Sequence, residues 1–186
     1  MMLDPRLHHL NSVSFHQIPH NDPSSMLSRA LYRFNRARWM AFVEWLKCRI
    51  LGREHRLLEL ESPAEQLHGN RRYGGIRPVN LDRICGTLGR SNDFDRRFLP
   101  LDDRLRDRWV SVAMARSRGI AIAPVELIQI GVCYFVKDGH HRISVARACG
   151  EQAIDAEVTI WEPYSGSIEP AIAVGILQPV ASAVVA

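Results

Sequence analysis

Apolar residues in the first third of the chain recur at steps of three and four, the pattern of an amphipathic helix. The pattern begins after a Pro-Ser-Ser sequence and stops at Gly52, and glycine commonly follows the end of a helix. We therefore predict a helix from about Ser25 to Leu51. Its apolar positions are Leu27, Leu31, Phe34, Ala41, Trp45 and Leu46.

Several shorter apolar segments later in the chain have the pattern of strands. The runs 125–130 and 132–136 are separated only by Gly131, which predicts a tight hairpin. Residues 154–161 alternate between apolar and polar positions, as in a sheet with one solvent-exposed face. A further set of apolar positions between Ile76 and Ile84 predicts one more strand.

Two helical patterns lie between these strands. One begins at Asp102-Asp103 and ends near Gly119, and the other begins at His140 and stops at Gly150. The fold class expected is α+β: a small mixed sheet with packed helices, preceded by a basic helical segment.

This pattern also predicts how the chain is divided. Residues 1–65 are expected to hold a flexible N-terminus and the basic helix, and residues 66–165 the α+β domain. Residues 166–186 form an apolar tail.

Positive charge is concentrated in the first predicted helix and the residues after it. The chain has a formal net charge of +4, and residues 24–56 contain eight arginines and lysines against two glutamates. Such a helix is typical of binding to nucleic acid, to an anionic membrane surface or to an acidic partner. A solvated arginine face on a docked helix is the simpler interpretation. If the helix binds a partner, we expect that partner to be DNA or RNA. A homodimer is a further possibility.

The remaining composition argues against a metal site, export and a membrane span. The four cysteines form no CxxC pair, so reduced thiols and a cytoplasmic location are expected. The first 25 residues lack the apolar core of a secretion signal. The uncharged stretch 170–186 is short and interrupted by Gly175 and Pro179, so a membrane is not the expected partner.

The candidate functional site is the sequence Asp138-Gly139-His140-His141-Arg142, where a predicted strand passes directly into a helix. The first backbone N–H groups of a helix have no partner within it and can bind a phosphate oxygen. Gly139 would allow close approach of the anion, His140 and His141 would add donors, and Arg142 would add a bidentate charged fork. Asp138 would either cap the helix or hold Mg²⁺, and capping is the favoured role.

The same turn resembles the Gly-x-x-Arg phosphate motif of the ParB/sulfiredoxin superfamily. The resemblance is carried by residues 138–142 with Ala146 and Gly150, and by the strand sequences 124–136 and 154–158. It implies a small α+β domain that binds a nucleoside triphosphate, CTP or ATP, with or without Mg²⁺. Sulfiredoxins have a catalytic cysteine where this chain has His140, so sulfinic acid reduction is not expected.

Three functions and one purely structural interpretation remain open. In the first, the chain is a nucleotide-binding switch or a DNA-maintenance factor. In the second, it is a nucleic-acid-binding protein that uses the arginine-rich helix, and in the third it is a Mg²⁺-dependent phosphotransferase or nuclease. Asp138 and Glu126 are the candidates for a catalytic carboxylate in the third case, so whether the chain is an enzyme stays open. In the structural interpretation Asp138 caps the helix, Arg142 pairs with an acidic neighbour such as Asp155, and both histidines lie on the surface.

Overall fold

A computed structural model describes residues 22–52, 55–60 and 69–163. The flexible start expected for residues 1–21 and the apolar tail expected for 166–186 lie outside the described residues. The elements are α1 (Pro23–Leu51), β1 (Leu58–Glu59), β2 (Gly69–Asn80), β3 (Ile84–Thr87), α2 (Arg106–Ser117), β4 (Val125–Ile130), β5 (Cys133–Asp138), α3 (His140–Ala148) and β6 (Ala153–Pro163).

The six strands form one mixed sheet in the order β1-β3-β5-β4-β6-β2. β3 pairs in parallel with both β1 and β5, and β4 pairs in parallel with β6, whereas β4 with β5 and β2 with β6 are antiparallel. Since β3 and β5 are parallel neighbours, their carboxyl ends reach the same edge of the sheet. In open sheets with parallel strands, ligands commonly bind outside such ends.

The main apolar core lies between the sheet and the helices. Fully buried side chains from α1, α2, β5 and α3 meet in it, among them Phe34, Trp109, Val136 and Ile143. A smaller cluster, centred on Phe135 and Trp161, covers the other side of β5 and β6. The sheet is therefore buried on both faces around β5, the strand that leads into the candidate site.

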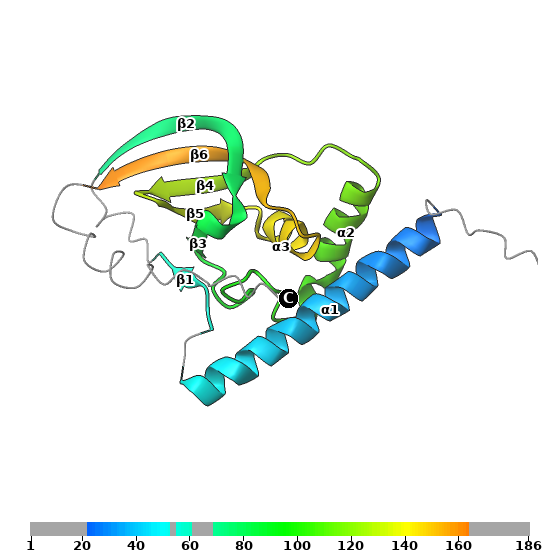
Figure 1. The fold of residues 1–186 in the computed structure, drawn as a ribbon. Coiled ribbons are helices and arrows are strands. Elements are labelled where there is room, and N and C mark those ends of the chain that lie inside the picture. The colour runs from blue at the N-terminus through cyan, green and yellow to red at the C-terminus, as the bar shows by residue number, and fades with distance from the viewer. Residues whose placement is uncertain (1–21, 53–54, 61–68, 164–186) are drawn as a thin grey trace, which may run out of the picture.

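Helix α1 lies along the outside of the molecule and packs against α2 (Figure 1). Asp22 caps it by accepting a hydrogen bond from the backbone N–H of Ser24, and Gly52 ends it in the left-handed conformation. Phe34 is its central contact, with its ring edge-on to Trp109 at 5.6 Å between centroids. The helix is thus fastened to the same core as the α+β residues.

Most of the expected elements are present, and the α+β fold class is confirmed by this sheet and its helices. The predicted hairpin at Gly131 joins β4 to β5, and helices occur at the three predicted places. The single strand predicted between Ile76 and Ile84 is wrong. The Asn80 side chain accepts a hydrogen bond from the Asp82 N–H at 2.8 Å and starts a 3-10 turn, so the segment divides between β2 and β3. Apolar spacing alone does not detect such a turn.

Replacing Phe34 with alanine should lower the free energy of unfolding by about 3–5 kcal/mol, because a fully buried aromatic ring would leave a cavity against Trp109. The matched control is Phe42→Ala on the exposed side of the same helix, which should cost less than about 0.5 kcal/mol. Urea unfolding followed by circular dichroism measures both. Equal losses in the two variants would contradict docking of α1 through Phe34.

Candidate functional site

The candidate site is built where β5 turns into α3. Gly139 stands between them at φ 102°, a conformation that side chains rarely adopt. A Cβ at this position would lie 2.6 Å from a methyl group of Val125 and 3.0 Å from the Arg142 Nε. Glycine is therefore required here both by backbone conformation and by the close approach of β4.

No side chain caps α3, which leaves the N–H groups of its first turn without a partner from the helix. The expected capping role of Asp138 is wrong. Gly139 occupies the N-cap position, and the Asp138 carboxylate lies 2.5 Å from the Arg142 guanidinium, four residues further along. The first turn of α3 thus keeps the partial positive charge that favours an anion.

Gly139→Ala should destabilise the protein by about 2–4 kcal/mol, because the energetic cost of a positive φ adds to that of a steric collision with Val125. Gly131→Ala is the matched control, since Gly131 also has a positive φ but a Cβ there would meet no atom within 4 Å. Its cost should stay near 1 kcal/mol. Chemical denaturation of both variants measures the difference, and a smaller loss at Gly139 than at Gly131 would show that the two strands do not approach closely at this point.

Both histidines of the turn are buried, which corrects the interpretation that places them on the surface. His140 is 4% exposed and His141 8%. The His140 Nε2 lies 2.6 Å from the Oγ1 of Thr87 at the end of β3, and Phe94 stacks on the His140 ring and lies edge-on to that of His141. Among the described residues the His141 Nδ1 has no hydrogen-bond partner.

Burial keeps both imidazoles uncharged at neutral pH. Desolvation, with the nearby positive charge of Arg90, lowers the pKa of His140 from about 6.5 to about 4. Desolvation, with the positive charges of Arg108 and Arg90, lowers the pKa of His141 to about 4 as well. The side chains therefore hold the turn in place by packing, and a role as cations toward a phosphate is not supported.

The buried histidines should make the protein less stable in mild acid. Between pH 6.5 and 4 the folded protein binds fewer protons at these sites than the unfolded chain does. The free energy of unfolding should therefore fall as the pH decreases, by up to roughly 2 kcal/mol per histidine between pH 7 and 5. Urea unfolding at a series of pH values measures this slope.

In His141→Phe the ring contact with Phe94 is kept and one titrating group is lost, so the slope should be about half as steep. Phe42→Ala, which changes an exposed ring on α1 that carries no titrating group, is the control and should leave the slope unchanged. A slope that is the same in His141→Phe as in the unmodified protein would contradict a buried, neutral His141.

Arg142 fastens the turn to the segment before β4. Its Nη1 donates hydrogen bonds to the backbone carbonyls of Ala123 and Pro124, both at 2.7 Å, and its other terminal nitrogen pairs with Asp138. The expected ion pair of Arg142 with an acidic neighbour is present, but the partner is Asp138 and not Asp155, which was the example expected. The guanidinium fork is thus already occupied, and Arg142 acts on the turn chiefly as a positioning residue.

Two further arginines lie close enough to this turn to affect its histidines. Arg90 follows β3, has a positive φ of 68° and pairs with Asp93 at 3.5 Å. Arg108 lies exposed on the first turn of α2, without an acidic partner among the described residues. Both are missed by sequence reasoning because they come from other elements. The only local signal is Gly89-Arg90, a turn-like sequence directly after a buried strand.

The two candidate catalytic carboxylates are cross-strand neighbours. Glu126 on β4 faces Asp138 on β5 in the sheet register, and the Glu126 carboxylate pairs with Lys137 at 2.8 Å. This hydrogen bond and charge pair raises the pKa of Lys137. Each carboxylate is thus engaged by a cation, and within the described part of the chain no group of three acidic, histidine or cysteine side chains could hold a metal.

Two cysteines that are distant in the sequence become neighbours in the sheet. The Sγ atoms of Cys85 on β3 and Cys133 on β5 lie 2.7 Å apart, and both thiols are free. The pKa of Cys85 is raised to about 12 by burial, by its hydrogen bond to Cys133 and by the electrostatic effect of the Cys133 thiol. A thiol with so high a pKa is a poor nucleophile at neutral pH.

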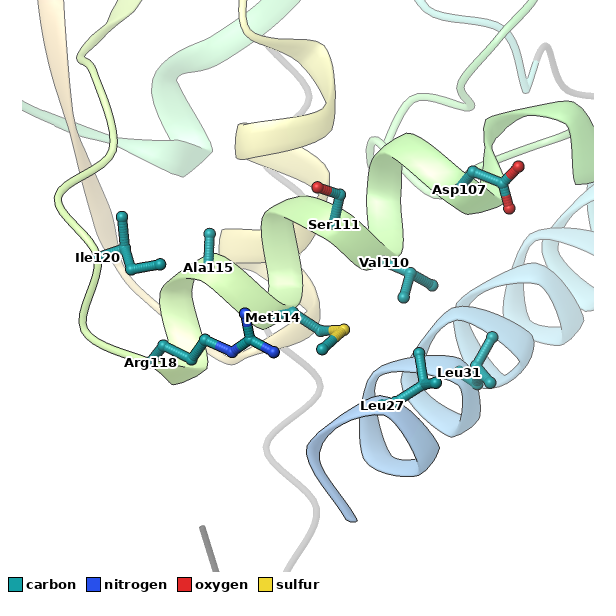
Figure 2. A pocket seen from close by; sticks show the side chains of 9 residues that line it. All are labelled: Leu27, Leu31, Asp107, Val110, Ser111, Met114, Ala115, Arg118 and Ile120. Carbon is teal, nitrogen blue, oxygen red and sulfur yellow. The ribbon is translucent and has the colours of Figure 1, made fainter. Parts of the chain in front are cut away.

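Two hollows of the described surface lie along α1, away from the turn. One, of about 480 Å³, lies between α1 and α2, where Leu27 and Leu31 face Val110 and Met114 (Figure 2). The other, of about 570 Å³, is lined by Trp39, Phe42 and Trp45 of α1 and by His55 and Leu101. Neither of these two hollows is lined by a residue of the turn.

Comparisons with known proteins give one structural likeness. No family model matches the chain, and no curated protein matches it. The chain is similar to the crystal structure of sulfiredoxin from Arabidopsis thaliana, at 17% sequence identity and a TM-score of 0.35, over 45% of this chain and 82% of that one.

None of the helices among the described residues is long and apolar enough to cross a membrane.

Proposed function

We propose that this chain binds the phosphate groups of a nucleotide, CTP or ATP, at the N-terminus of α3. One observation carries the proposal: an uncapped helix N-terminus follows a glycine with positive φ, at the carboxyl ends of two parallel strands. Partial positive charge and N–H groups without a side-chain cap make this a suitable site for phosphate oxygens.

The charges around the turn fit the same ligand. Arg90, Arg108 and Arg142 come from three separate segments, and the first two act electrostatically on the buried histidines. Asp93 and Asp138 balance Arg90 and Arg142, and Arg108 has no acidic partner among the described residues. A phosphate would compete with Asp93 for the Arg90 guanidinium and would contact Arg108 directly, and guanidinium groups form stronger, bidentate contacts with phosphate than ammonium groups do.

The histidines of the motif have a supporting role in this proposal. His140 ties the end of β3 to the start of α3 through Thr87, and so couples the segment that carries Arg90 to the helix N-terminus. His140, His141 and Arg142 would bind the phosphate with their backbone N–H groups rather than with their side chains.

Mg²⁺ fits this site only as the ion that a nucleoside triphosphate carries. The Asp138 carboxylate is paired with Arg142, and the described residues supply no cluster of carboxylates for a metal held by the protein alone. A nucleotide-dependent switch in the cytoplasm, where nucleotides are abundant, is the role that this chemistry suits best.

Arg90→Ala and Arg108→Ala should each weaken nucleotide binding about tenfold, because each removes a charge-assisted contact to a phosphate. Arg72→Ala is the control: this arginine lies on edge strand β2, which β6 and β4 separate from β5, and it should leave the affinity unchanged. Isothermal titration with Mg²⁺ complexes of CTP, ATP and GTP measures the three affinities. The proposal fails if none of these nucleotides gives heat, or if Arg72→Ala weakens binding as much as the other two.

A further inference from the structure

The outward face of α1 carries a continuous row of large apolar side chains. Trp39, Phe42, Leu46 and Ile50 are 66%, 56%, 44% and 75% exposed. They follow one another at steps of three, four and four residues, which places them within about 80° of arc on a helix. We call these four residues the apolar stripe.

The apolar stripe lies opposite the face by which α1 is docked. The docked face is made by Ala30, Phe34, Ala37 and Ala41, all buried. Helix α1 runs along the outside of the molecule, and α2 is the element that it packs against most (Figure 1). Exposed contiguous apolar surface of this kind commonly marks an interaction site.

Cations flank the apolar stripe on both sides. The helical angle places Arg36 and Lys47 on one flank and Arg49 on the other. None of these three has an acidic partner among the described residues, and α1 as a whole contains six cations and one anion, Glu44. The occupant of this surface must therefore be apolar at its centre and negatively charged at its edges.

Three other occupants fit less well. A second copy would bring two helices of the same strong charge together, which is repulsive. Nucleic acid has no apolar surface that would favour contact with the aliphatic side chains of Leu46 and Ile50. The Phe42 ring, which could stack on a base, already stacks on Trp45, with 5.8 Å between the ring centroids. An acidic peptide could enter the hollow beside Trp39 and Phe42, but the other two residues of the stripe lie outside that hollow.

We propose that α1 binds the surface of an anionic lipid bilayer, with its axis in the plane of the membrane. The apolar stripe enters the boundary between headgroups and acyl chains, and Arg36, Lys47 and Arg49 contact the lipid phosphates. Such attachment needs no membrane-spanning segment. It departs from the expectation that a membrane is not a partner, and it takes up the anionic membrane surface that is typical of a basic amphipathic helix. It is independent of the nucleotide site at Gly139.

The test is cosedimentation of the full chain with vesicles of phosphatidylglycerol and phosphatidylcholine in equal parts, and with vesicles of phosphatidylcholine alone. Binding should be at least about tenfold tighter to the anionic vesicles and should weaken with added salt. Tryptophan fluorescence should shift to shorter wavelength on binding. Trp109 and Trp161 are buried in the folded protein, so the shift reports on the two exposed tryptophans of α1.

Matched variants distinguish binding through the apolar stripe from binding through any exposed apolar surface. Leu46→Ser with Ile50→Ser should weaken binding more than about tenfold. Tyr73→Ser with Ile76→Ser removes two other exposed large side chains, on β2, and should leave the affinity unchanged. Arg36→Gln and Arg49→Gln should each weaken binding about fivefold, and Arg118→Gln, at the C-cap of α2, should have no effect. Circular dichroism confirms that every variant is folded.

Four results would overturn the proposal. The first is no binding to the anionic vesicles at low ionic strength, and the second is equal binding to both vesicle types. The third is equal loss in the stripe variant and in the β2 control. The fourth is that single-stranded DNA, RNA or an acidic amphipathic peptide binds through Leu46 and Ile50 while the vesicles do not.

Discussion

The close approach of Gly139 to Val125 is the contact on which the rest of the site depends. A side chain at position 139 would collide with β4, so only glycine lets β5 end and α3 begin within one residue. This abrupt turn buries the two histidines that follow, brings Arg142 back to the carbonyls of Ala123 and Pro124, and leaves the N-terminus of α3 without a cap. Backbone sterics, rather than any charged side chain, thus create the region suited to an anion.

The sequence predicts this turn well because its signal is local. Gly139 stands between a strand-like and a helix-like pattern, and the signal for the hairpin at Gly131 is equally local. The structure confirms both the strand-to-helix turn and the hairpin. The division of residues 76–84 between two strands depends on a side chain, Asn80, that competes with the sheet for a backbone N–H. Patterns of apolar residues contain no information on that competition.

What the sequence could not predict is set by contacts between distant segments. The burial of His140 and His141 depends on Phe94, and the positive charge near them on Arg90 and Arg108, none of which is adjacent in the sequence. The capping role expected for Asp138 fails because Arg142, one helical turn away, takes its carboxylate. The side chains expected to bind the anion are therefore buried, as in His140 and His141, or already paired, as in Arg142.

The most direct measurement of the central claim is a titration of the isotopically labelled protein with Mg²⁺-CTP and Mg²⁺-ATP, followed by two-dimensional amide NMR. If the N-terminus of α3 binds phosphate, the largest saturable shifts belong to the backbone amides of His140, His141 and Arg142, with smaller ones at Arg90. Shifts that are absent at millimolar nucleotide, or that concentrate on α1 while these three amides stay unmoved, would contradict it.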